Sequence, residues 1–148
     1  MDDAPFAFAA LIPELAVADR RASVRFYRDL LGFAVAYDRP EEGFAFLRLG
    51  DAQLMVQEIG AHRVLAPAGA PLERPLGQGV NLQIAIPATE PLIDRLTAAG
   101  VALAPPSEER WYRAGGGEAG VRQFAVLDPD GYYLRLAQGI GWRPERAG

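Results

Sequence analysis

Hydrophobic and polar residues alternate along residues 9–17, and Leu11 and its alternate neighbours lie on one side of the segment. This period of two predicts a strand whose apolar side, including Leu11, packs against a helix. Asp19 follows where a helix N-cap would stand, and apolar residues then recur every three or four positions through residues 20–31. Gly32 is placed to end that helix. The chain therefore begins with a strand and a helix.

Three shorter strands are predicted next, at residues 33–37, 43–49 and 52–58, with a tight turn at Gly50-Asp51 between the last two. The same order of elements returns in the second half, as a strand at 80–86, a helix at 89–99 and strands at 101–104, 122–127 and 132–137. Asp128-Pro129-Asp130-Gly131 supplies a turn before the last strand. The sequence therefore predicts an α+β fold made of two βαβββ modules.

We expect these modules to form a single domain over residues 1–148. The expected parts are module one at about 7–58, a crossover loop at 59–79, module two at about 80–138 and a tail at 139–148. The crossover contains prolines and glycines throughout, which predicts a long loop. Loops of this length within compact domains are usually functional lids or crossovers.

Each predicted sheet has an aliphatic face for its helix and a second face that mixes polar and apolar residues. The mixed face carries Glu14 and Gln57 in module one, and Asn81, Gln83 and Arg135 in module two. A buried polar group without a partner costs ~1–3 kcal/mol, so this face should line a wet cavity or a ligand site. An ordinary solvent-exposed sheet face explains the same pattern, and the residues alone leave both interpretations open.

Composition excludes several classes of function. The chain has 148 residues and no cysteine, which rules out disulfides, thiolate metal sites and a cysteine nucleophile. Its 15 basic residues are scattered along a chain of net charge -4, so we expect no nucleic-acid partner. The longest apolar stretch, residues 6–13, is far shorter than the roughly 20 residues that cross a bilayer. With an N-terminus that reads Met-Asp-Asp, we expect a cytoplasmic protein without a secretory signal.

Three segments, in this order, resemble the vicinal oxygen chelate superfamily of glyoxalases, bleomycin resistance proteins and dioxygenases. They are PELAVAD at 13–19, SVRFYRDLLGF at 23–33 and DPDGYYLR at 128–135. The resemblance implies the glyoxalase/bleomycin resistance fold, in which two βαβββ modules form a curved mixed sheet with a concave cleft. These segments determine packing and turn geometry, so they carry little information on chemistry.

Enzymes of this superfamily hold one divalent metal ion with His, Glu or Gln side chains from four strands. The resemblance places those four positions here at Ile12, Met55, Asn81 and Arg135. Isoleucine offers no donor atom, a thioether is too soft for Mg²⁺ or Mn²⁺, and a guanidinium cation repels the ion. We therefore expect no metal and no cofactor. His62, the one histidine, lies in the long loop, where we expect it to be solvated.

The resemblance then implies the branch that binds ligands without a metal ion, typified by bacterial bleomycin-resistance proteins, which sequester the drug as dimers. We expect a homodimer that binds an aromatic or glycopeptide-like antibiotic or metabolite, such as a bleomycin-like molecule, through aromatic and carboxylate side chains. A strand edge covered by the partner subunit is an equal interpretation for the aromatic pair at 111–112. The expected ligand-binding residues are Glu14, Phe46, Met55, Gln57, Asn81, Gln83, Trp111, Tyr112 and Arg135.

Other functions stay open at this point, although the resemblance favours a protein without catalysis. A metal-independent lyase or isomerase, or a dioxygenase-like enzyme with an atypical site, would use Glu14 as general base and Arg135 to stabilise an oxyanion. A plain ion pair is the simpler explanation of those two residues. A metalloenzyme would need relocated ligands such as Glu58, His62 or Glu118. A self-associating module, with its cleft filled by its own side chains, would bind no ligand.

Overall fold

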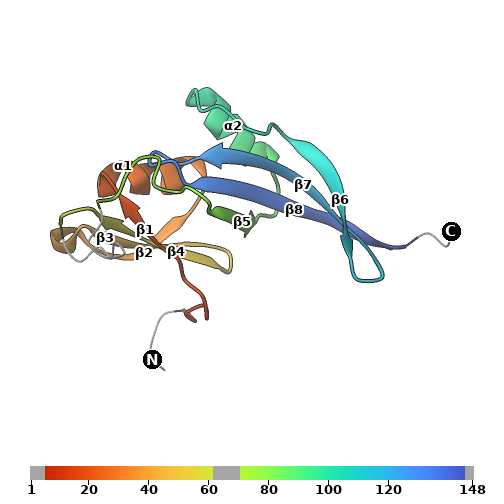
Figure 1. Ribbon diagram of the computed structural model, residues 1–148, viewed down its shortest axis with the longest axis horizontal. Helices are drawn as coiled ribbons and strands as arrows, with labels where there is room; N and C mark the ends of the chain where they lie inside the picture. The colour runs from red at the N-terminus through yellow and green to blue at the C-terminus, as the bar shows by residue number, and fades with distance from the viewer. Residues whose placement is uncertain (1–5, 62–70, 146–148) are drawn as a thin grey trace. The chain divides into compact units, whose positions relative to one another are not determined.

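The computed structural model describes residues 6–61 and 71–145, and the chain divides into two compact units. Unit one runs from Met1 to Pro71 and unit two from Leu72 to Gly148. Each unit contains a four-stranded sheet, with the order β1-β4-β3-β2 in unit one and β5-β8-β7-β6 in unit two (Figure 1). The same order occurs twice, so the predicted pair of βαβββ modules and the α+β class are confirmed.

Unit one follows the predicted order of elements. They are β1 (Glu14–Val17), α1 (Arg20–Arg25), η1 (Phe26–Leu30), β2 (Ala34–Arg39), η2 (Pro40–Glu42), β3 (Phe44–Leu49) and β4 (Ala52–Glu58). β1 pairs in parallel with β4, whereas β3 pairs antiparallel with β2 and β4. The predicted turn between β3 and β4 is confirmed, and Gly50 adopts a φ of +57° that most other residues avoid.

The predicted helix of unit one is confirmed in two consecutive parts. The Asp19 carboxylate accepts hydrogen bonds from the backbone N–H groups of Arg21 (2.9 Å) and Ala22 (3.2 Å), which caps α1. The π-helical turn η1 follows α1 directly, and Gly32 then adopts a φ of +84°. Tyr27, on this helix, is completely buried in the core of unit one.

The prediction of a strand at residues 9–17 is wrong in its length. Regular pairing begins only with β1, and Leu11, expected to pack against the helix, is 84% exposed. A side chain holds the preceding backbone instead: Gln53 accepts a hydrogen bond from the Ala9 amide (2.8 Å) and donates one to the Ala7 carbonyl (2.7 Å). Alternation of residue types cannot distinguish a paired strand from an extended segment whose backbone bonds to a side chain.

Unit two contains β5 (Asn81–Ala85), α2 (Glu90–Ala98), β6 (Glu108–Ala114), β7 (Gly117–Leu127) and β8 (Tyr133–Pro144). β5 pairs in parallel with β8, and β7 pairs antiparallel with β6 and β8. α2 covers one face of this sheet (Figure 1), and Leu96 of the helix is completely buried, as are Leu134 and Leu136 of β8. The Thr89 amide donates to Gln138 Oε1 at 3.2 Å, which ties the start of the helix to β8.

The third strand of unit two lies later in the chain than predicted. Residues 101–104 do not form a strand, and β6 takes that place at 108–114. Pro105 and Pro106 lack the backbone N–H that a strand ladder needs, so pairing with Ala125 is limited to two hydrogen bonds there. β7 and β8 are also longer than predicted, and β8 continues to Pro144, through most of the segment assigned to the tail.

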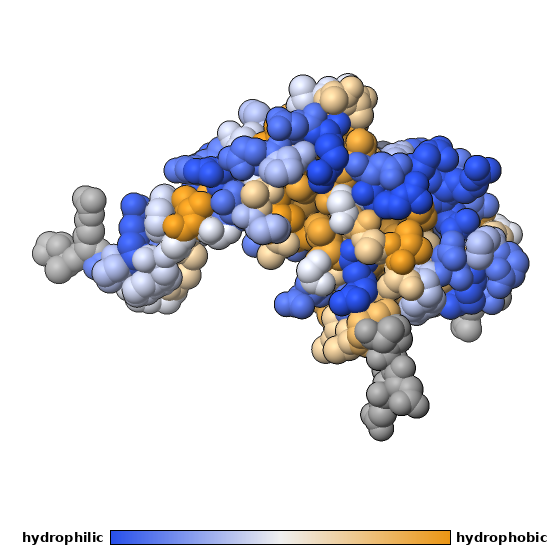
Figure 2. Space-filling view, turned by 180° about the vertical axis from the view of Figure 1, so that it is seen from behind, coloured by the Kyte–Doolittle hydropathy of each residue, from blue (hydrophilic) through white to orange (hydrophobic). Residues whose placement is uncertain are grey.

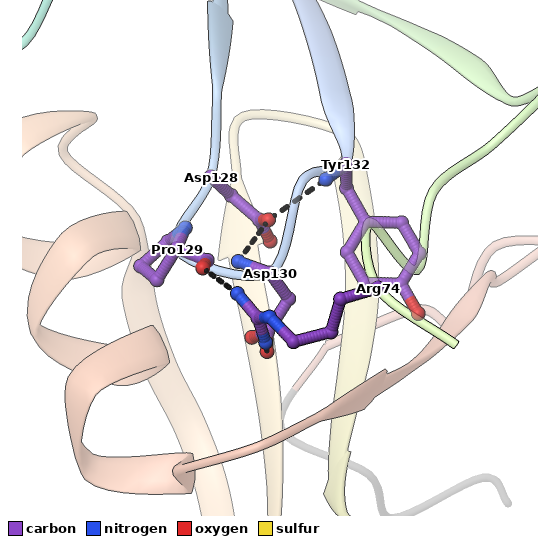
Figure 3. A network of polar contacts seen from close by, with 5 residues as sticks. All are labelled: Arg74, Asp128, Pro129, Asp130 and Tyr132. Carbon is purple, nitrogen blue, oxygen red and sulfur yellow. Dashed lines mark hydrogen bonds and ion pairs between the residues drawn. The ribbon is translucent and has the colours of Figure 1, made fainter. Parts of the chain in front are cut away.

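The predicted turn before β8 is confirmed, and buried carboxylates hold it (Figure 3). Asp128 Oδ1 accepts hydrogen bonds from the amides of Asp130 and Tyr132, both at 2.9 Å. Arg74 donates to Asp130 Oδ1 at 2.7 Å and to the Pro129 carbonyl oxygen at 2.6 Å. The part of the 59–79 loop that follows residue 70 is therefore attached to this turn, and residues 62–70 lie outside the described residues.

Apolar side chains also reach the surface. Figure 2 shows hydrophobic residues among hydrophilic ones on the face opposite to the view of Figure 1. Exposed examples are Leu11, Tyr37, Tyr112 and Trp142. Within residues 6–61 and 71–145, every helix is too short or too polar to cross a bilayer.

Candidate functional site

Polar side chains gather on the sheet face of unit two that points away from α2, which we call open face two. Residues paired directly across neighbouring strands lie on the same face of a sheet. The register pairs Asn81 with Tyr133 and Gln83 with Arg135. On β7, Gln123 pairs with Glu108 of β6 and with Ala137 of β8, which also lies on this face. All four strands of unit two thus contribute polar residues to one surface.

Short hydrogen bonds orient these side chains. Arg135 Nη2 donates to Gln83 Oε1 at 2.7 Å. Gln123 Nε2 donates to the Tyr112 hydroxyl at 2.7 Å and to Glu108 Oε1 at 3.3 Å. Gln123 is only 3% exposed, so its side chain is fixed in this arrangement. Open face two is therefore a preorganised polar surface.

Two polar atoms of open face two remain unpaired within the described part of the chain. They are the acceptor Gln123 Oε1 and the donor Arg135 Nε, both buried. An unpaired buried polar group costs about 1–3 kcal/mol, so folded proteins rarely keep one unless water or a ligand pairs with it. Diagonal neighbours on adjacent strands are about 7–8 Å apart, which one ligand can span. An amide group, with one donor and one acceptor, suits this pair of atoms.

Glu108 adds a negative charge to the same face. Arg110 donates a hydrogen bond to Glu108 Oε2 at 3.1 Å. That bond, together with the one from Gln123, lowers the pKa of Glu108 below its ordinary value. The carboxylate is therefore ionised at neutral pH and can attract a cationic group of a ligand.

The corresponding face of unit one, open face one, is aromatic at its centre. Phe46 is 1% exposed and stacks on Tyr37, with ring centroids 5.0 Å apart and ring planes at 16°. Phe6 and Phe8 also contact Phe46, with ring centroids at 5.5 Å and 5.6 Å from its centroid. Residues from the beginning of the chain thus fill the middle of open face one.

A small hollow remains beside this aromatic cluster. The Arg48 guanidinium lies 4.3 Å above the ring of Phe6, and its buried Nε has no partner among the described residues. A pocket of about 250 Å³ is lined here by residues that include Arg48, Asp51 and Gln53. Small-molecule sites usually enclose roughly 300–1,000 Å³, so this hollow is small for an organic ligand.

The expected ligand residues of unit one all lie on open face one, but they differ in accessibility. Glu14 is exposed, and Met55, its partner in the register, is half-buried. Phe46 belongs to the aromatic cluster, and Gln57 is buried and donates to the Glu42 carbonyl at 2.7 Å. A ligand can reach Glu14 and Met55 without any rearrangement of this unit.

The expected residues of unit two divide between its two faces. Asn81, Gln83, Tyr112 and Arg135 share open face two. Trp111 lies on the opposite face, with α2, because neighbours along a strand alternate. Its ring occupies the space above Gly120, where a Cβ would come within 2.7 Å of it, and Arg143 stacks on it at 4.2 Å. The sequence analysis missed Gln123 and Glu108, although alternation along 122–127 already places Gln123 on the face opposite to Phe124 and Val126.

The positions that the family resemblance assigns to a metal ion do not fit one. Ile12 has no donor atom, Met55 offers a thioether, and the guanidinium of Arg135 is itself a cation that donates to Gln83. Within residues 6–61 and 71–145, His, Asp and Glu side chains form no group of three that could hold a metal ion. The residues present therefore do not match the donor set of the superfamily's metalloenzymes.

The relocated ligands considered above have other partners where the structure describes them. Glu58 Oε2 accepts a hydrogen bond from the Arg20 amide at 2.9 Å, next to the start of α1. Glu118 forms an ion pair with Arg143 at 2.7 Å. His62 lies outside the described residues. Glu58 and Glu118 thus stabilise local structure, each within its own unit.

Comparison with protein families matches residues 8–136 to the Glyoxalase/Bleomycin resistance protein/Dioxygenase superfamily. No curated protein matches the chain. Among solved structures, TioX from Micromonospora sp. ML1 is 21% identical, and the match covers 90% of this chain and 100% of that chain with a TM-score of 0.67.

Two further structures show how varied the relatives are. Lactoylglutathione lyase from Agrobacterium tumefaciens is 19% identical, with 88% of this chain and 92% of that chain covered and a TM-score of 0.57. The fosfomycin resistance protein FosX from Listeria monocytogenes is 18% identical, with 90% and 94% covered and a TM-score of 0.56. At these identities the likeness shows the fold alone, and one fold serves several chemistries.

Proposed function

The chain belongs to the glyoxalase/bleomycin resistance protein/dioxygenase superfamily, and from this premise we propose that it binds a small molecule without a metal ion, on open face two. The proposed ligand is an aromatic or glycopeptide-like antibiotic or metabolite that carries an amide and a cationic group. A bleomycin-like molecule fits this description and is the first compound to test.

The observation that carries the proposal is the unpaired acceptor and donor at Gln123 Oε1 and Arg135 Nε. Other hydrogen bonds already orient both side chains, and a ligand would reach these buried atoms once the neighbouring side chains that cover them move aside. An amide of the ligand would donate to Gln123 and accept from Arg135. These two hydrogen bonds would pair both of the unpaired atoms, which favours binding.

Two neighbouring residues support the aromatic and cationic parts of the ligand. Tyr112 is 44% exposed, so part of its ring is available for stacking. The ionised Glu108 carboxylate can pair with an ammonium or guanidinium group, and the net charge of -4 attracts cations from solution. In unit one, the exposed carboxylate of Glu14 and the half-buried Met55 beside it are separate proposed ligand contacts.

We propose further that the protein works as a homodimer in the bacterial cytoplasm. Trp142 is 60% exposed and Tyr112 lies on the neighbouring part of the same sheet, so a partner subunit would find apolar surface there. Sedimentation equilibrium of the wild-type chain and of Trp142→Ser tests this point. A monomer at micromolar concentration contradicts it.

Calorimetric titration of the metal-free protein with bleomycin and a panel of aromatic, amide-bearing antibiotics tests the ligand proposal. For a ligand that binds, Gln123→Leu and Arg135→Met should each raise Kd about tenfold or more, since each removes one ligand hydrogen bond to a buried group. Arg122→Met is the matched control, because Arg122 lies on the α2 side of β7 and pairs with Glu90 and Glu109. Absence of heat with every compound contradicts the proposed binding of an antibiotic.

A metal-independent lyase or isomerase is the second candidate, and one observation favours it. Glu14 is exposed and forms no ion pair within residues 6–61 and 71–145, so its carboxylate is available as a general base. If a substrate is found, Glu14→Gln should abolish turnover while leaving binding nearly unchanged. Unchanged turnover in that variant excludes Glu14 as the base.

A further inference from the structure

The helix of unit one carries a groove lined mainly by arginine. Arg20, Arg21, Arg25 and Arg28 line it together with Val35 of β2 and one carboxylate, Asp38. Its volume is about 400 Å³, within the range of roughly 300–1,000 Å³ that is usual for small-molecule sites. This arginine groove, as we call it, lies within unit one and shares no residue with open face one.

The spacing of the arginines places them on one side of the helix. Residues three or four positions apart are neighbours on a helix surface, as are Arg21 and Arg25, and then Arg25 and Arg28. Like charges at this spacing destabilise a helix, so the arrangement works against the stability of α1. A chain whose net charge is -4 nevertheless concentrates four of its 15 basic residues here.

The carboxylates near the groove leave two of these arginines unpaired. Asp38 binds Arg20 at 3.0 Å, and Asp29 binds Arg28 at 2.7 Å. Within the described residues, the side chains of Arg21 and Arg25 have neither an ion pair nor a hydrogen bond. Two guanidinium groups thus face the groove with all of their donors available.

One wall of the groove is fixed in advance. The Arg20 side chain is 15% exposed and held by Asp38, and its amide donates to Glu58 Oε2 at 2.9 Å. The next two amides of α1 bind the Asp19 carboxylate. Since these backbone donors are occupied, a ligand would be held by the guanidinium side chains.

From this arrangement we propose that the arginine groove binds a small phosphorylated molecule that carries at least two adjacent anionic groups, as pyrophosphate does. Guanidinium groups bind phosphate oxygens in a bidentate manner, and two neighbouring arginines match two neighbouring phosphates. Among the described residues, the lining contains no aromatic ring on which a base could stack, which favours a compact anion over a nucleic acid. This binding is independent of the ligand proposed for open face two.

Calorimetry with pyrophosphate at physiological salt is the direct test, with inorganic phosphate, a single-stranded oligonucleotide and phosphatidylglycerol vesicles as comparison ligands. We expect saturable binding of one pyrophosphate per chain, and weaker binding of phosphate. The double variant Arg21→Gln/Arg25→Gln should raise Kd by ~10-fold or more, because each substitution removes a charge-assisted hydrogen bond. Both residues are exposed, so the variant should fold, and its thermal unfolding is measured alongside.

The matched control is Arg113→Gln/Arg143→Gln, which removes the same charge from unit two. Its affinity for pyrophosphate should stay within twofold of the wild-type value. Equal weakening in both double variants would show a general charge effect and overturn the proposal. So would the absence of saturable pyrophosphate binding, or binding of only the oligonucleotide or only the vesicles.

Discussion

The two units use one topology to build two different open faces. In unit one, Gln53, one of two buried glutamines on the open face, has both its oxygen and its nitrogen bonded to the backbone of residues 7–9. In unit two, the buried glutamine, Gln123, has its nitrogen bonded but its oxygen unpaired. Each open face keeps one unpaired guanidinium nitrogen within the described residues, at Arg48 in unit one and at Arg135 in unit two, but only the second face also leaves a glutamine oxygen unpaired.

This difference separates the residues that specify the fold from those that can specify a ligand. The aliphatic face of each sheet and its helix repeat between the units, because packing requires it. The open faces have no such requirement and diverge. An internal repeat of this kind therefore preserves the framework and allows each copy its own surface chemistry.

The largest effect we predict comes from the centre of open face one. Phe46→Ala should lower the free energy of unfolding by about 3–5 kcal/mol, since a buried ring that contacts three other aromatic rings is removed. Urea denaturation followed by circular dichroism measures it. Phe46→Leu, which keeps most of the apolar volume, is the control and should lose much less. Removing a well-packed buried ring usually costs roughly 3–5 kcal/mol. A loss below about 1 kcal/mol for the alanine variant would therefore mean that the side chains of this face are not closely packed.

The second prediction concerns Gln53, the satisfied glutamine. Gln53→Leu leaves the Ala9 amide and the Ala7 carbonyl without their partner, so we expect a loss of about 1–3 kcal/mol. The amides of residues 7–9 should also exchange with solvent faster, which hydrogen exchange detected by mass spectrometry can follow. Unchanged exchange in that segment would contradict the role we give to this side chain.

The sequence predicted the framework well because packing leaves a periodic trace. The strand at 52–58, the Asp19 cap and the Asp128–Gly131 turn are all present, and each depends on residues close together in the chain. The errors lie where a distant partner decides. Gln53 holds residues 7–9, so the start of the strand expected at 9–17 is not paired with another strand. The strand expected at 101–104 is displaced by two prolines and by the pairing of β6 with β7.

The candidate site could be predicted only in part. Alternation identified Gln83 and Arg135 on one face, and the register confirms that they are paired. It could not reveal that Phe46 would be covered by Phe6 and Phe8, since that contact joins residues 38 to 40 positions apart. Nor could it reveal the unpaired oxygen of Gln123, because the presence of a hydrogen-bond partner depends on three-dimensional positions.

The third prediction sharpens the comparison directly. Gln123→Leu should change the free energy of unfolding by less than about 1 kcal/mol, because the unpaired buried oxygen that it removes offsets the loss of two hydrogen bonds, to the exposed Tyr112 and to Glu108. Comparison of Gln123→Leu with Gln53→Leu tests whether a buried glutamine stabilises the fold in unit one but contributes little to stability in unit two. Equal losses in the two variants, measured by the same urea titration, would remove the distinction.

The smallest effect concerns the charge on open face two. Arg110→Gln should raise the pKa of Glu108 towards its ordinary value, since the hydrogen bond from Arg110 is the main cause of the lowered pKa. A carboxylate whose pKa is lowered in the folded state stabilises that state above its unfolded pKa, and the contribution disappears as pH falls through the folded value. Carbon-13 NMR titration of the glutamate carboxyls measures the shift. Arg113→Gln, on the opposite face of β6, is the control and should leave the pKa of Glu108 unchanged. A shift in both variants would show that the overall charge of β6, and not the contact with Arg110, lowers the pKa of Glu108.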